Sequence, residues 1–298
     1  MLDYAALRAV YMVLEEGTFE RAALRLNVTP SAISHRVKAL EERVGTPLVV
    51  RSSPCYATEA GRRLCRHIER VHLLEAKLQD DFPGLISQKT GGRKAKVRIV
   101  VNADSLSTWC MDAFADFTTK TGYLLDLVVE DQDFTLDWLT KGEADAAITS
   151  TSDAAVGCNV LPLGTLRYHA TASPAFVSRY FPEGIDKECL AKAPSLTFNR
   201  KDSLQRRWIF KAFGQHVEHQ THWVPSSTAF IDAAIRGIGW GMNPEPLVAK
   251  HLASGTLMEL VEGCHIDTLL YWQINRLSAN LLSELTTCVA RTAKAKLR

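Results

Sequence analysis

The chain of 298 residues is 46% hydrophobic and 23% charged, with a formal net charge of +2. Because one domain usually takes roughly 100–200 residues, this length predicts two or three compact units. The chain contains no run of about 18 apolar residues, and its start lacks the basic segment and cleavage site of a secretory signal. Its seven cysteines are scattered, never as Cys-x-x-Cys. We therefore expect a soluble, cytoplasmic protein with reduced thiols and no membrane partner, and neither a zinc ribbon nor a redox pair.

The positive charge gathers near the start of the chain. Residues 1–70 contain 11 Lys and Arg against 8 Asp and Glu, whereas residues 71–298 contain 24 against 25. An excess this small does not establish nucleic-acid binding, so the geometry of the predicted helices has to decide.

Two helices are predicted before residue 27. Apolar residues follow the i, i+3, i+4, i+7 spacing of one helix face at Leu7, Val10, Tyr11 and Leu14. Gly17 ends this helix, and Thr18 can cap a second, short one. The stretch "LNVT" that follows is long enough only for a turn.

The sequence "NVTPSAISHRVKALEE" (27–42) predicts a third helix with two unlike faces. Thr29 is its N-cap and Pro30 its first residue, where a missing N–H costs nothing. At about 100° per residue, one narrow arc holds Ile33, Val37, Leu40 and Val44. The opposite side displays Ser31, Ser34, His35 and Lys38, with Arg36 on its flank.

The order of these helices favours a DNA-binding role for the polar side. A helix-turn-helix places the N-terminal part of its second helix in the major groove, where hydroxyl, imidazole and amine groups meet base edges and phosphates. An ordinary solvated helix face is the alternative interpretation. The capped short helix and the four-residue turn before it favour DNA binding instead.

A hairpin and a long helix are predicted next. After Gly45, "TPLVVRSSPCYATEAG" has the composition of a short hairpin, a wing on which Arg51 could hold a phosphate. The predicted DNA-binding residues are therefore Thr29, Pro30, Ser31, Ser34, His35, Arg36, Lys38 and Arg51. Thr58 then caps a long helix with an apolar seam at Leu64, Ile68, Val71, Leu78 and Phe82, beside Leu74. Such a seam predicts pairing with a second copy of the chain, with packing against its own domain as the alternative.

The rest of the chain alternates between strand and helix patterns. "PG" (83–84) ends the long helix, and "SQKTGGRKAK" (87–96) has the composition of a hinge. The strand "VRIVV", the helix "DSLSTWCMDAFADFTTKTG", the strand "LLDLVVED", the helix "TLDWLTKGEA" and the strand "DAAITS" then predict a parallel sheet with helices on its faces. A second α/β set follows, and the strand "TLLYWQI" and a helix from Ser278 to Lys296 return to the first.

Four segments are thus predicted: a DNA-binding domain (1–58), a linker helix (59–86), a hinge (87–96) and an α/β domain (97–298). The α/β domain would have two lobes, lobe I at about 97–163 and 268–298 and lobe II at about 164–267. Such lobes suggest a hinged cleft between them, with crossings near 163–168 and 264–268.

Ligands of open parallel sheets bind beyond the carboxyl ends of the strands, at helix N-termini. This rule selects Asn102, Asp104, Ser105 and Ser107; Glu130, Asp131 and Asp133; Ser150 and Thr151; Phe198 and Asn199; and Ser226, Ser227 and Thr228. Hydroxyls and helix amides suit a carboxylate, whereas the acids suit an ammonium or guanidinium group. A basic amino acid has both kinds of group, although any single acid here also fits a solvated loop carboxylate or a helix cap.

The quoted motifs together resemble the LysR-type transcriptional regulators. "TPSAISHRVKALEERVGTPLVVR", "TEAG" and the long helix match the DNA-binding half of that family, whereas Pro30 and His35 stand where many members have glutamine. "VNADSLSTW" (101–109), "VED" (129–131) and "LLYW" (269–272) look like the lysine- and arginine-responsive ArgP/LysG subgroup. The resemblance implies no cofactor but an effector, lysine or arginine, with control of amino-acid export or metabolism genes.

The resemblance also implies a fold and partners. The fold is an N-terminal winged helix-turn-helix with a long linker helix, followed by a two-lobed α/β effector domain like a periplasmic binding protein. The partners are promoter DNA, a second copy bound through the linker helix in a homodimer and commonly a homotetramer, and RNA polymerase. Effector closure of the cleft would change the angle between paired DNA-binding modules.

Other functions find less support in the sequence. Motifs for a serine nucleophile elbow, a glycine-rich phosphate loop and a zinc protease are all missing, so we expect no enzyme. "GIGWG" (237–241) follows a predicted helix, unlike a dinucleotide fingerprint, and the histidines of "HVEHQTH" (216–222) fit a surface loop better than a metal site. Two alternatives stay open: the same architecture sensing a different ligand, and a ligand-binding or enzymatic α/β protein whose N-terminal module only oligomerises.

Overall fold

The computed structural model describes residues 2–82, 94–130 and 135–298. The chain forms two compact units, Met1–Val97 and Arg98–Arg298, each with a hydrophobic core of its own. The finer predicted boundaries at residues 58, 86 and 96 stay predictions, because most of the predicted hinge lies outside the described residues.

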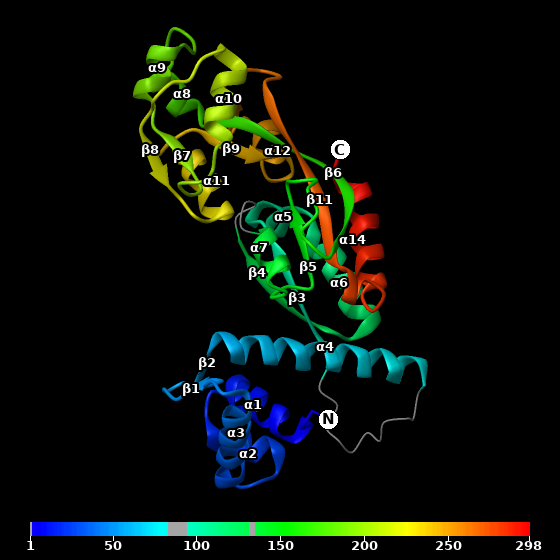
Figure 1. Cartoon of the computed structure of the whole chain (residues 1–298). Helices are drawn as coiled ribbons and strands as arrows, with labels where there is room; N and C mark the ends of the chain where they lie inside the picture. The colour runs from blue at the N-terminus through cyan, green and yellow to red at the C-terminus, as the bar shows by residue number, and fades with distance from the viewer. Residues whose placement is uncertain (1, 83–93, 131–134) are drawn as a thin grey trace. The chain divides into compact units, whose positions relative to one another are not determined.

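Three helices begin the N-terminal unit: α1 (Tyr4–Glu16), α2 (Phe19–Leu26) and α3 (Pro30–Val44) (Figure 1). The predicted caps are confirmed, since Thr18 Oγ1 accepts the Arg21 N–H and Thr29 Oγ1 accepts the Ala32 N–H, each at 3.2 Å. Gly17 ends α1 in the left-handed conformation with φ 76°. These local signals position α2 and α3 as a helix-turn-helix.

The core of this unit forms where α3 packs against α1. Ile33, Val37 and Leu40 are buried, as the helix pattern predicts. The prediction for Val44 is wrong, because its side chain is 47% exposed at the end of the helix. By then α3 has run past the helices that cover its apolar face.

A short hairpin and a long helix complete the unit. Strands β1 (Val49–Val50) and β2 (Tyr56–Ala57) pair antiparallel, which confirms the predicted wing. Helix α4 (Glu59–Asp81) begins at the predicted cap, where Thr58 Oγ1 accepts the Gly61 N–H at 3.1 Å. The α4 backbone passes so near the wing that only glycine fits at Gly61.

The C-terminal unit begins with lobe I, whose first elements are β3 (Lys96–Val101), α5 (Ala103–Thr108), α6 (Cys110–Thr121), β4 (Leu124–Val129), α7 (Thr135–Thr140) and β5 (Ala146–Thr149). The chain then crosses along β6 (Cys158–Ala172). Lobe II contains α8 (Pro174–Tyr180), α9 (Lys187–Lys192), β7 (Ser195–Thr197), α10 (Leu204–Phe213), β8 (Thr221–Trp223), α11 (Ser227–Ile235), β9 (Gly241–Pro244), α12 (Glu245–Ala253) and β10 (Met258–Glu259). It returns along β11 (His265–Asn275) to α13 (Arg276–Ala279) and α14 (Ser283–Lys296).

The two lobes share one mixed sheet. The strand order is β10-β6-β11-β5-β3-β4, with β9 also paired to β6. The predicted parallel pairing is found for β3 with β5 and for β7 with β8, but β11 pairs antiparallel with both β5 and β6. The two predicted crossings are therefore long strands that lie side by side and extend from one lobe to the other (Figure 1).

The helix predicted over 104–122 is two helices. Trp109 interrupts it between α5 and α6, with φ −130° and its side chain 1% exposed. Burying this large ring in lobe I turns the chain, so that α5 alone stands at the end of β3. The predicted end at Gly122 is confirmed.

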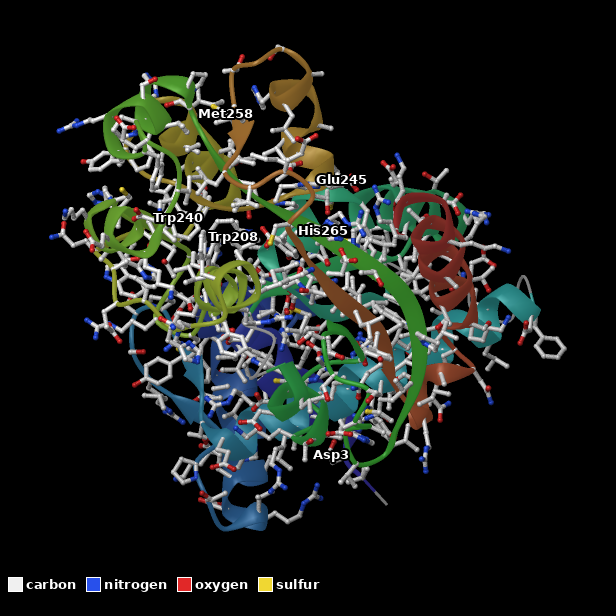
Figure 2. The ribbon with its side chains drawn as sticks, turned by 90° about the horizontal axis from the view of Figure 1, so that it is seen from above. Asp3, Trp208, Trp240, Glu245, Met258 and His265 are labelled. Carbon is white, nitrogen blue, oxygen red and sulfur yellow. The ribbon has the colours of Figure 1, made fainter. Side chains whose placement is uncertain are left out.

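Two buried tryptophans pack against each other in lobe II. The rings of Trp208 on α10 and Trp240 before β9 have centroids 5.2 Å apart, and both side chains are fully buried (Figure 2). Trp208 Nε1 also donates to the Cys264 carbonyl oxygen at 2.8 Å, just before β11. This packing fixes α10, whose N-terminal end faces lobe I.

Candidate functional site

The exposed side of α3 presents polar groups as the sequence predicts. Ser31, His35 and Lys38 are exposed, and Ser34 and Arg36 are half-buried. Lys38 Nζ lies 3.7 Å from Glu42 Oε1, a solvated ion pair that leaves the amine accessible. We call Ser31, Ser34, His35 and Lys38 the recognition face.

The N-terminal end of α3 is also exposed at Thr29 and Pro30. The Thr29 hydroxyl oxygen lies 3.0 Å from Ser31 Oγ, in addition to capping the helix. Both hydroxyls therefore stand at the tip of the helix, where a helix-turn-helix approaches the groove.

Arg51 lies between the wing and the helix pair. Its guanidinium is 5.2 Å from the centre of the Phe19 ring and 3.9 Å from Glu41 Oε2. Glu41 Oε1 in turn accepts the Leu48 N–H at 2.8 Å, which ties the wing to α3. Arg51 is thus held beside the start of α2 with its side chain 54% exposed.

Helix α4 has an exposed apolar stripe in its C-terminal half. Leu74, Leu78 and Phe82 are 55%, 44% and 60% exposed, whereas Ile68 at the other end of the predicted seam is buried in the core. The predicted seam therefore divides into a part that packs within the unit and a part that faces solvent. We call Leu74, Leu78 and Phe82 the linker stripe.

A cleft of about 250 Å³ opens in the C-terminal unit at the ends of β3 and β4. Residues of lobe I, of the segment before α10 and of β11 line it: Asn102, Ala103, Asp104, Val129, Glu130, Phe198, Asn199, Lys201, Asp202, Ser203, Leu204, Arg207 and Thr268. Its volume suits a small molecule of amino-acid size. The position matches the predicted edge, beyond the carboxyl ends of the strands.

Two buried polar groups of the lining stand out. Among the described residues, neither Asn102 Nδ2 nor Thr268 Oγ1 has a hydrogen-bond partner, although the two residues are only 6% and 7% exposed. The other side-chain atom of Asn102 is engaged, because Oδ1 accepts the Ser105 N–H at 2.7 Å and caps α5. An amide N–H and a hydroxyl in this position suit an acceptor such as a carboxylate.

Charged groups of both signs surround these donors. Lys201 and Arg207 are exposed, and Glu130 is half-buried on the lobe I side. Asp202 holds its own loop together, because its two carboxylate oxygens accept the Phe198 and Leu204 N–H groups at 3.1 and 3.0 Å. The cleft therefore offers partners for a ligand that has both an anionic and a cationic end.

Asp104 connects the two lobes across the cleft. Its Oδ2 accepts the Tyr168 hydroxyl and its Oδ1 accepts the Ser227 hydroxyl, each at 2.9 Å. Burial raises the pKa of this carboxyl, and the two hydrogen bonds oppose that rise. Both oxygens of the predicted ligand residue are thus already engaged by lobe II.

The structure brings five of the predicted effector residues to the cleft: Asn102, Asp104, Glu130, Phe198 and Asn199. Seven others are not part of its lining, although Ser227 donates to the lining residue Asp104: Ser105, Ser107, Ser150, Thr151, Ser226, Ser227 and Thr228. Ser105 is fully buried, and Ser226 caps α11 by accepting the Ala229 N–H at 3.4 Å. Asp131 and Asp133 lie outside the described residues.

Five polar residues of the lining are not predicted from the sequence: Lys201, Asp202, Ser203, Arg207 and Thr268. The pattern "DS" is a local signal for a helix start at Asp202 and Ser203, the two residues before α10. The other three have no local signal, because only the pairing of β11 with β6 and the packing of α10 bring them to the cleft.

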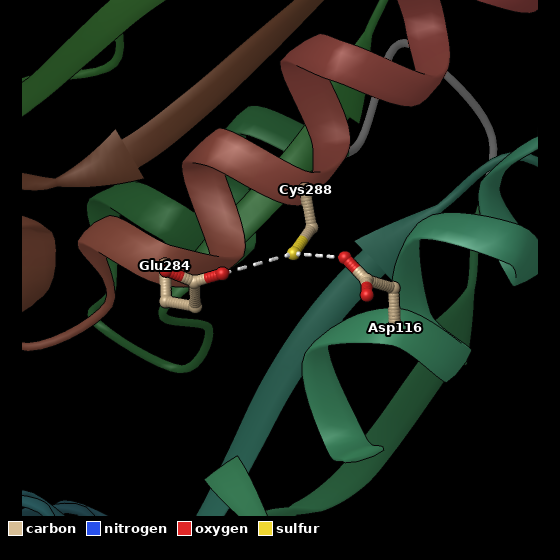
Figure 3. Close-up of side chains that lie close together, drawn as sticks. All are labelled: Asp116, Glu284 and Cys288. Carbon is tan, nitrogen blue, oxygen red and sulfur yellow. Dashed lines mark hydrogen bonds between the residues drawn. The ribbon is translucent and has the colours of Figure 1, made fainter. Parts of the chain in front are cut away.

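A separate cluster joins α6 to α14, as Figure 3 shows. Within the described ranges, Asp116, Glu284 and Cys288 have possible metal-ligand atoms within 4.8 Å of one another. Cys288 Sγ donates to Asp116 Oδ2 at 2.9 Å, and burial raises the pKa of this thiol to about 12. Lys120 Nζ lies 2.7 Å from Glu284 Oε1 and 3.3 Å from Asp116 Oδ2. A protonated thiol and a bridging ammonium give this cluster the chemistry of a helix-to-helix contact.

The histidines of "HVEHQTH" have separate contacts. The His216 ring stacks on Phe210 with centroids 5.0 Å apart, and His219 Nδ1 lies 3.0 Å from the Val217 carbonyl oxygen. Across the described part of the chain, no helix has the length and apolarity needed to cross a bilayer.

Comparison with known proteins covers both units. A family model described as the bacterial regulatory helix-turn-helix protein, lysR family, matches residues 4–62, and one for the LysR substrate binding domain matches residues 90–294. The transcriptional regulator ArgP of Pseudomonas aeruginosa (strain UCBPP-PA14) is 42% identical over 286 residues, which are 96% of this chain and 94% of that protein.

Two solved structures resemble the whole chain. ArgP from Mycobacterium tuberculosis has a TM-score of 0.79 and 40% identity, with 100% of this chain and 99% of that chain covered. Full-length LysG from Corynebacterium glutamicum with bound effector Arg has a TM-score of 0.68 and 37% identity, with 100% of both chains covered.

Proposed function

Because the chain belongs to the LysR family of bacterial transcriptional regulators, we propose that its recognition face binds operator DNA and that its cleft binds lysine or arginine as the effector. The single observation that supports the effector most directly is the cleft with two buried, unpartnered donors beside charges of both signs. The regulated genes would then be those of amino-acid export or metabolism.

The DNA-binding role rests on the exposure of α3. Ser31, Ser34, His35 and Lys38 would read base edges, with Thr29 and Pro30 at the tip of the helix, while Arg36 and Arg51 would contact phosphates. Ile33 and Val37 on the opposite side of α3 are packed in the core. The exposed side could therefore enter a DNA groove while the helix stays packed in its unit. Two such modules would occupy successive half-sites.

The effector role rests on complementary chemistry at the two ends of a basic amino acid. Its carboxylate would accept from Asn102 Nδ2 and Thr268 Oγ1, with Lys201 and Arg207 nearby. Its cationic side chain would face Glu130. That LysG from Corynebacterium glutamicum has Arg as its bound effector supports this choice. The described effector candidates outside the lining, Ser105, Ser107, Ser150, Ser226 and Ser227, would act without contacting the effector.

Assembly and partners complete the proposal. The linker stripe would pair two copies in a dimer, and two dimers would form a tetramer on DNA. We propose a cytoplasmic location, contact with RNA polymerase, no catalytic activity and no cofactor besides the effector. The similar proteins ArgP and LysG are named as transcriptional regulators, which supports a regulatory role without catalysis.

Calorimetry on the full chain tests the effector. Arginine and lysine are each expected to bind with a measurable heat. Citrulline, the uncharged isostere of arginine, and agmatine, which lacks the carboxylate, are each expected to bind at least about tenfold more weakly. If a simple carboxylate from a control panel binds more tightly than either basic amino acid, the same architecture senses a different ligand.

Titration with promoter-sized DNA at several salt concentrations tests the proposed DNA binding. The logarithm of the affinity should fall linearly with the logarithm of the salt concentration. An affinity for DNA too weak to measure at low salt would instead favour an α/β binding protein or enzyme whose first unit only oligomerises.

A further inference from the structure

Asp104 stands at a different place in the site from the other acids. Both of its carboxylate oxygens accept hydroxyl groups from lobe II, Tyr168 on β6 and Ser227 at the start of α11, each at 2.9 Å. Tyr168 is 1% exposed and Ser227 is 8% exposed, so water does not replace these bonds while the lobes stay together. Asp104 itself belongs to α5 of lobe I.

The two donors come from different elements of the same lobe. Tyr168 lies on the part of β6 that pairs with β9, opposite Pro244, and is therefore part of lobe II. Ser227 is the first residue of α11, whose body packs in the lobe II core. Two anchors on separate elements fix the carboxylate in position and direction, because rotation about one bond would break the other.

Holding Asp104 in place also holds Asn102, whose Nδ2 is the hydrogen-bond donor that lobe I offers to a ligand. Asn102 is the N-cap of α5, two residues before Asp104, and its Oδ1 accepts the Ser105 N–H at 2.7 Å. The unpartnered Asn102 Nδ2 therefore moves with α5. Thr268 Oγ1, the second unpartnered donor, lies on β11, which runs beside β6.

We propose that Asp104, Tyr168 and Ser227 form an interlobe latch that holds the cleft in its ligand-binding geometry, and that Asp104 is a positioning residue. The latch sets the fraction of molecules in which Asn102 and Thr268 line the same cleft. The apparent dissociation constant of an effector equals its intrinsic dissociation constant divided by that fraction, so a weaker latch weakens the binding of every effector by one common factor. This inference rests on the proposed effector function of the cleft.

Loss of one hydroxyl tests the latch without removing Asp104. Tyr168→Phe keeps the ring in the core and deletes one donor, and Ser227→Ala deletes the other. Each variant should raise the dissociation constants of arginine and lysine by the same factor, about tenfold, because the ligand contacts are unchanged. In the double variant the dissociation constants should rise by less than the product of the two single-variant factors, because both hydroxyls donate to the same carboxylate.

Hydrogen exchange without effector gives an independent readout. The amides of Ala103–Thr108 and Ser227–Ile235 should exchange about tenfold faster in Tyr168→Phe than in the unmodified chain, whereas those of α14 should not change. Tyr180→Phe, which deletes a phenol hydroxyl elsewhere in lobe II, is the matched control and should leave both affinity and exchange unaltered.

Three results would overturn the latch: unchanged exchange in Tyr168→Phe, affinity changes that differ strongly between arginine and lysine, or an equal effect of Tyr180→Phe. Strong discrimination between the two effectors would instead place Asp104 in direct contact with their cationic ends. If the unmodified chain binds neither amino acid, the proposed function is wrong, while the exchange measurement still decides whether the latch exists.

Discussion

Gly61 in α4 approaches the wing so closely that a β-carbon at this position would stand 2.0 Å from the carbonyl oxygen of Leu48. No side chain can give way there, because the obstructing atom belongs to the backbone. Gly61→Ala should therefore displace the wing from α4 and lower the free energy of unfolding of the N-terminal unit by about 3 kcal/mol or more.

Thermal unfolding followed by circular dichroism measures this loss. Gly45→Ala is the comparison, because a β-carbon there meets no atom within 4 Å and only the left-handed φ of 78° is unfavourable. That variant should cost roughly 1–2 kcal/mol. A Gly61→Ala protein as stable as Gly45→Ala would show that the close approach does not exist.

Lys38→Ala should weaken operator binding by roughly tenfold and leave effector binding intact, because the amine lies on the recognition face and Lys38 does not line the cleft. Fluorescence anisotropy with operator DNA measures the first effect and calorimetry the second. Lys141→Ala is a matched control, since Lys141 also forms an exposed ion pair at 3.7 Å, with Asp137. Equal loss of DNA and effector binding in Lys38→Ala would contradict the separate roles of the two units.

Glu130→Lys should abolish the response to arginine and lysine while basal DNA binding stays unchanged. The new ammonium would repel the cationic side chain of the effector, which weakens binding by at least about tenfold. Footprinting with and without lysine reads both properties together. Glu262→Lys makes the same charge change at an exposed position outside the cleft lining and should retain the response.

Phe82→Glu should shift the protein toward the monomer, because it places a charge in the exposed linker stripe. Sedimentation equilibrium measures the assembly state, and the dimer dissociation constant should rise by at least about a hundredfold if the stripe is covered by a second copy. Gln79→Glu adds the same charge to an exposed position of α4 off the stripe. An unchanged assembly state in Phe82→Glu would mean that dimers form elsewhere.

Cys288→Ala should make the contact between α6 and α14 less sensitive to acid. The Cys288 thiol, first, and then Arg291 and Lys120 lower the pKa of Asp116 to about 2. Because this pKa is depressed in the folded state, the stabilisation is complete above the ordinary pKa of 3.8 and disappears as the pH falls through about 2.

Melting temperatures between pH 2 and 7 test this linkage. The melting temperature of Cys288→Ala should differ most from that of the unmodified chain above about pH 4, and this difference should become smaller toward pH 2. Cys110→Ala removes an equally buried thiol that has no carboxylate partner among the described residues, so its difference in melting temperature from the unmodified chain should not vary with pH. A constant difference for Cys288→Ala as well would contradict the proposed effect on Asp116.

The N-terminal unit could be predicted from sequence because its signals are local. Thr18, Thr29 and Thr58 each lie within three residues of the amide that they cap, and the recognition face follows from the periodicity of one helix. The exception, Val44, depends on where neighbouring helices end, which periodicity does not contain.

The cleft could be predicted only in part, because its residues come together through long-range pairing. The strand-end rule found Asn102 and Glu130, which follow β3 and β4 directly. It also selected Asp104 as a ligand residue, without a signal for the hydroxyls of Tyr168 and Ser227 that engage it from 64 and 123 positions away. Thr268 has no local signal, because only the antiparallel pairing of β11 with β6 brings it to the cleft.

The two crossing strands determine which movements the lobes can make. β6 and β11 are hydrogen-bonded to each other along their length. Sliding one strand along the other would break these hydrogen bonds, whereas bending the two-stranded ribbon perpendicular to its plane would keep them. The register shifts between Leu270 and Tyr271, opposite Gly164, and such a bulge locally bends and loosens a ribbon. The effector domain should therefore flex about a transverse axis near this point. The direction of the conformational signal is thus set by the geometry of the ribbon rather than by the identity of the bound molecule.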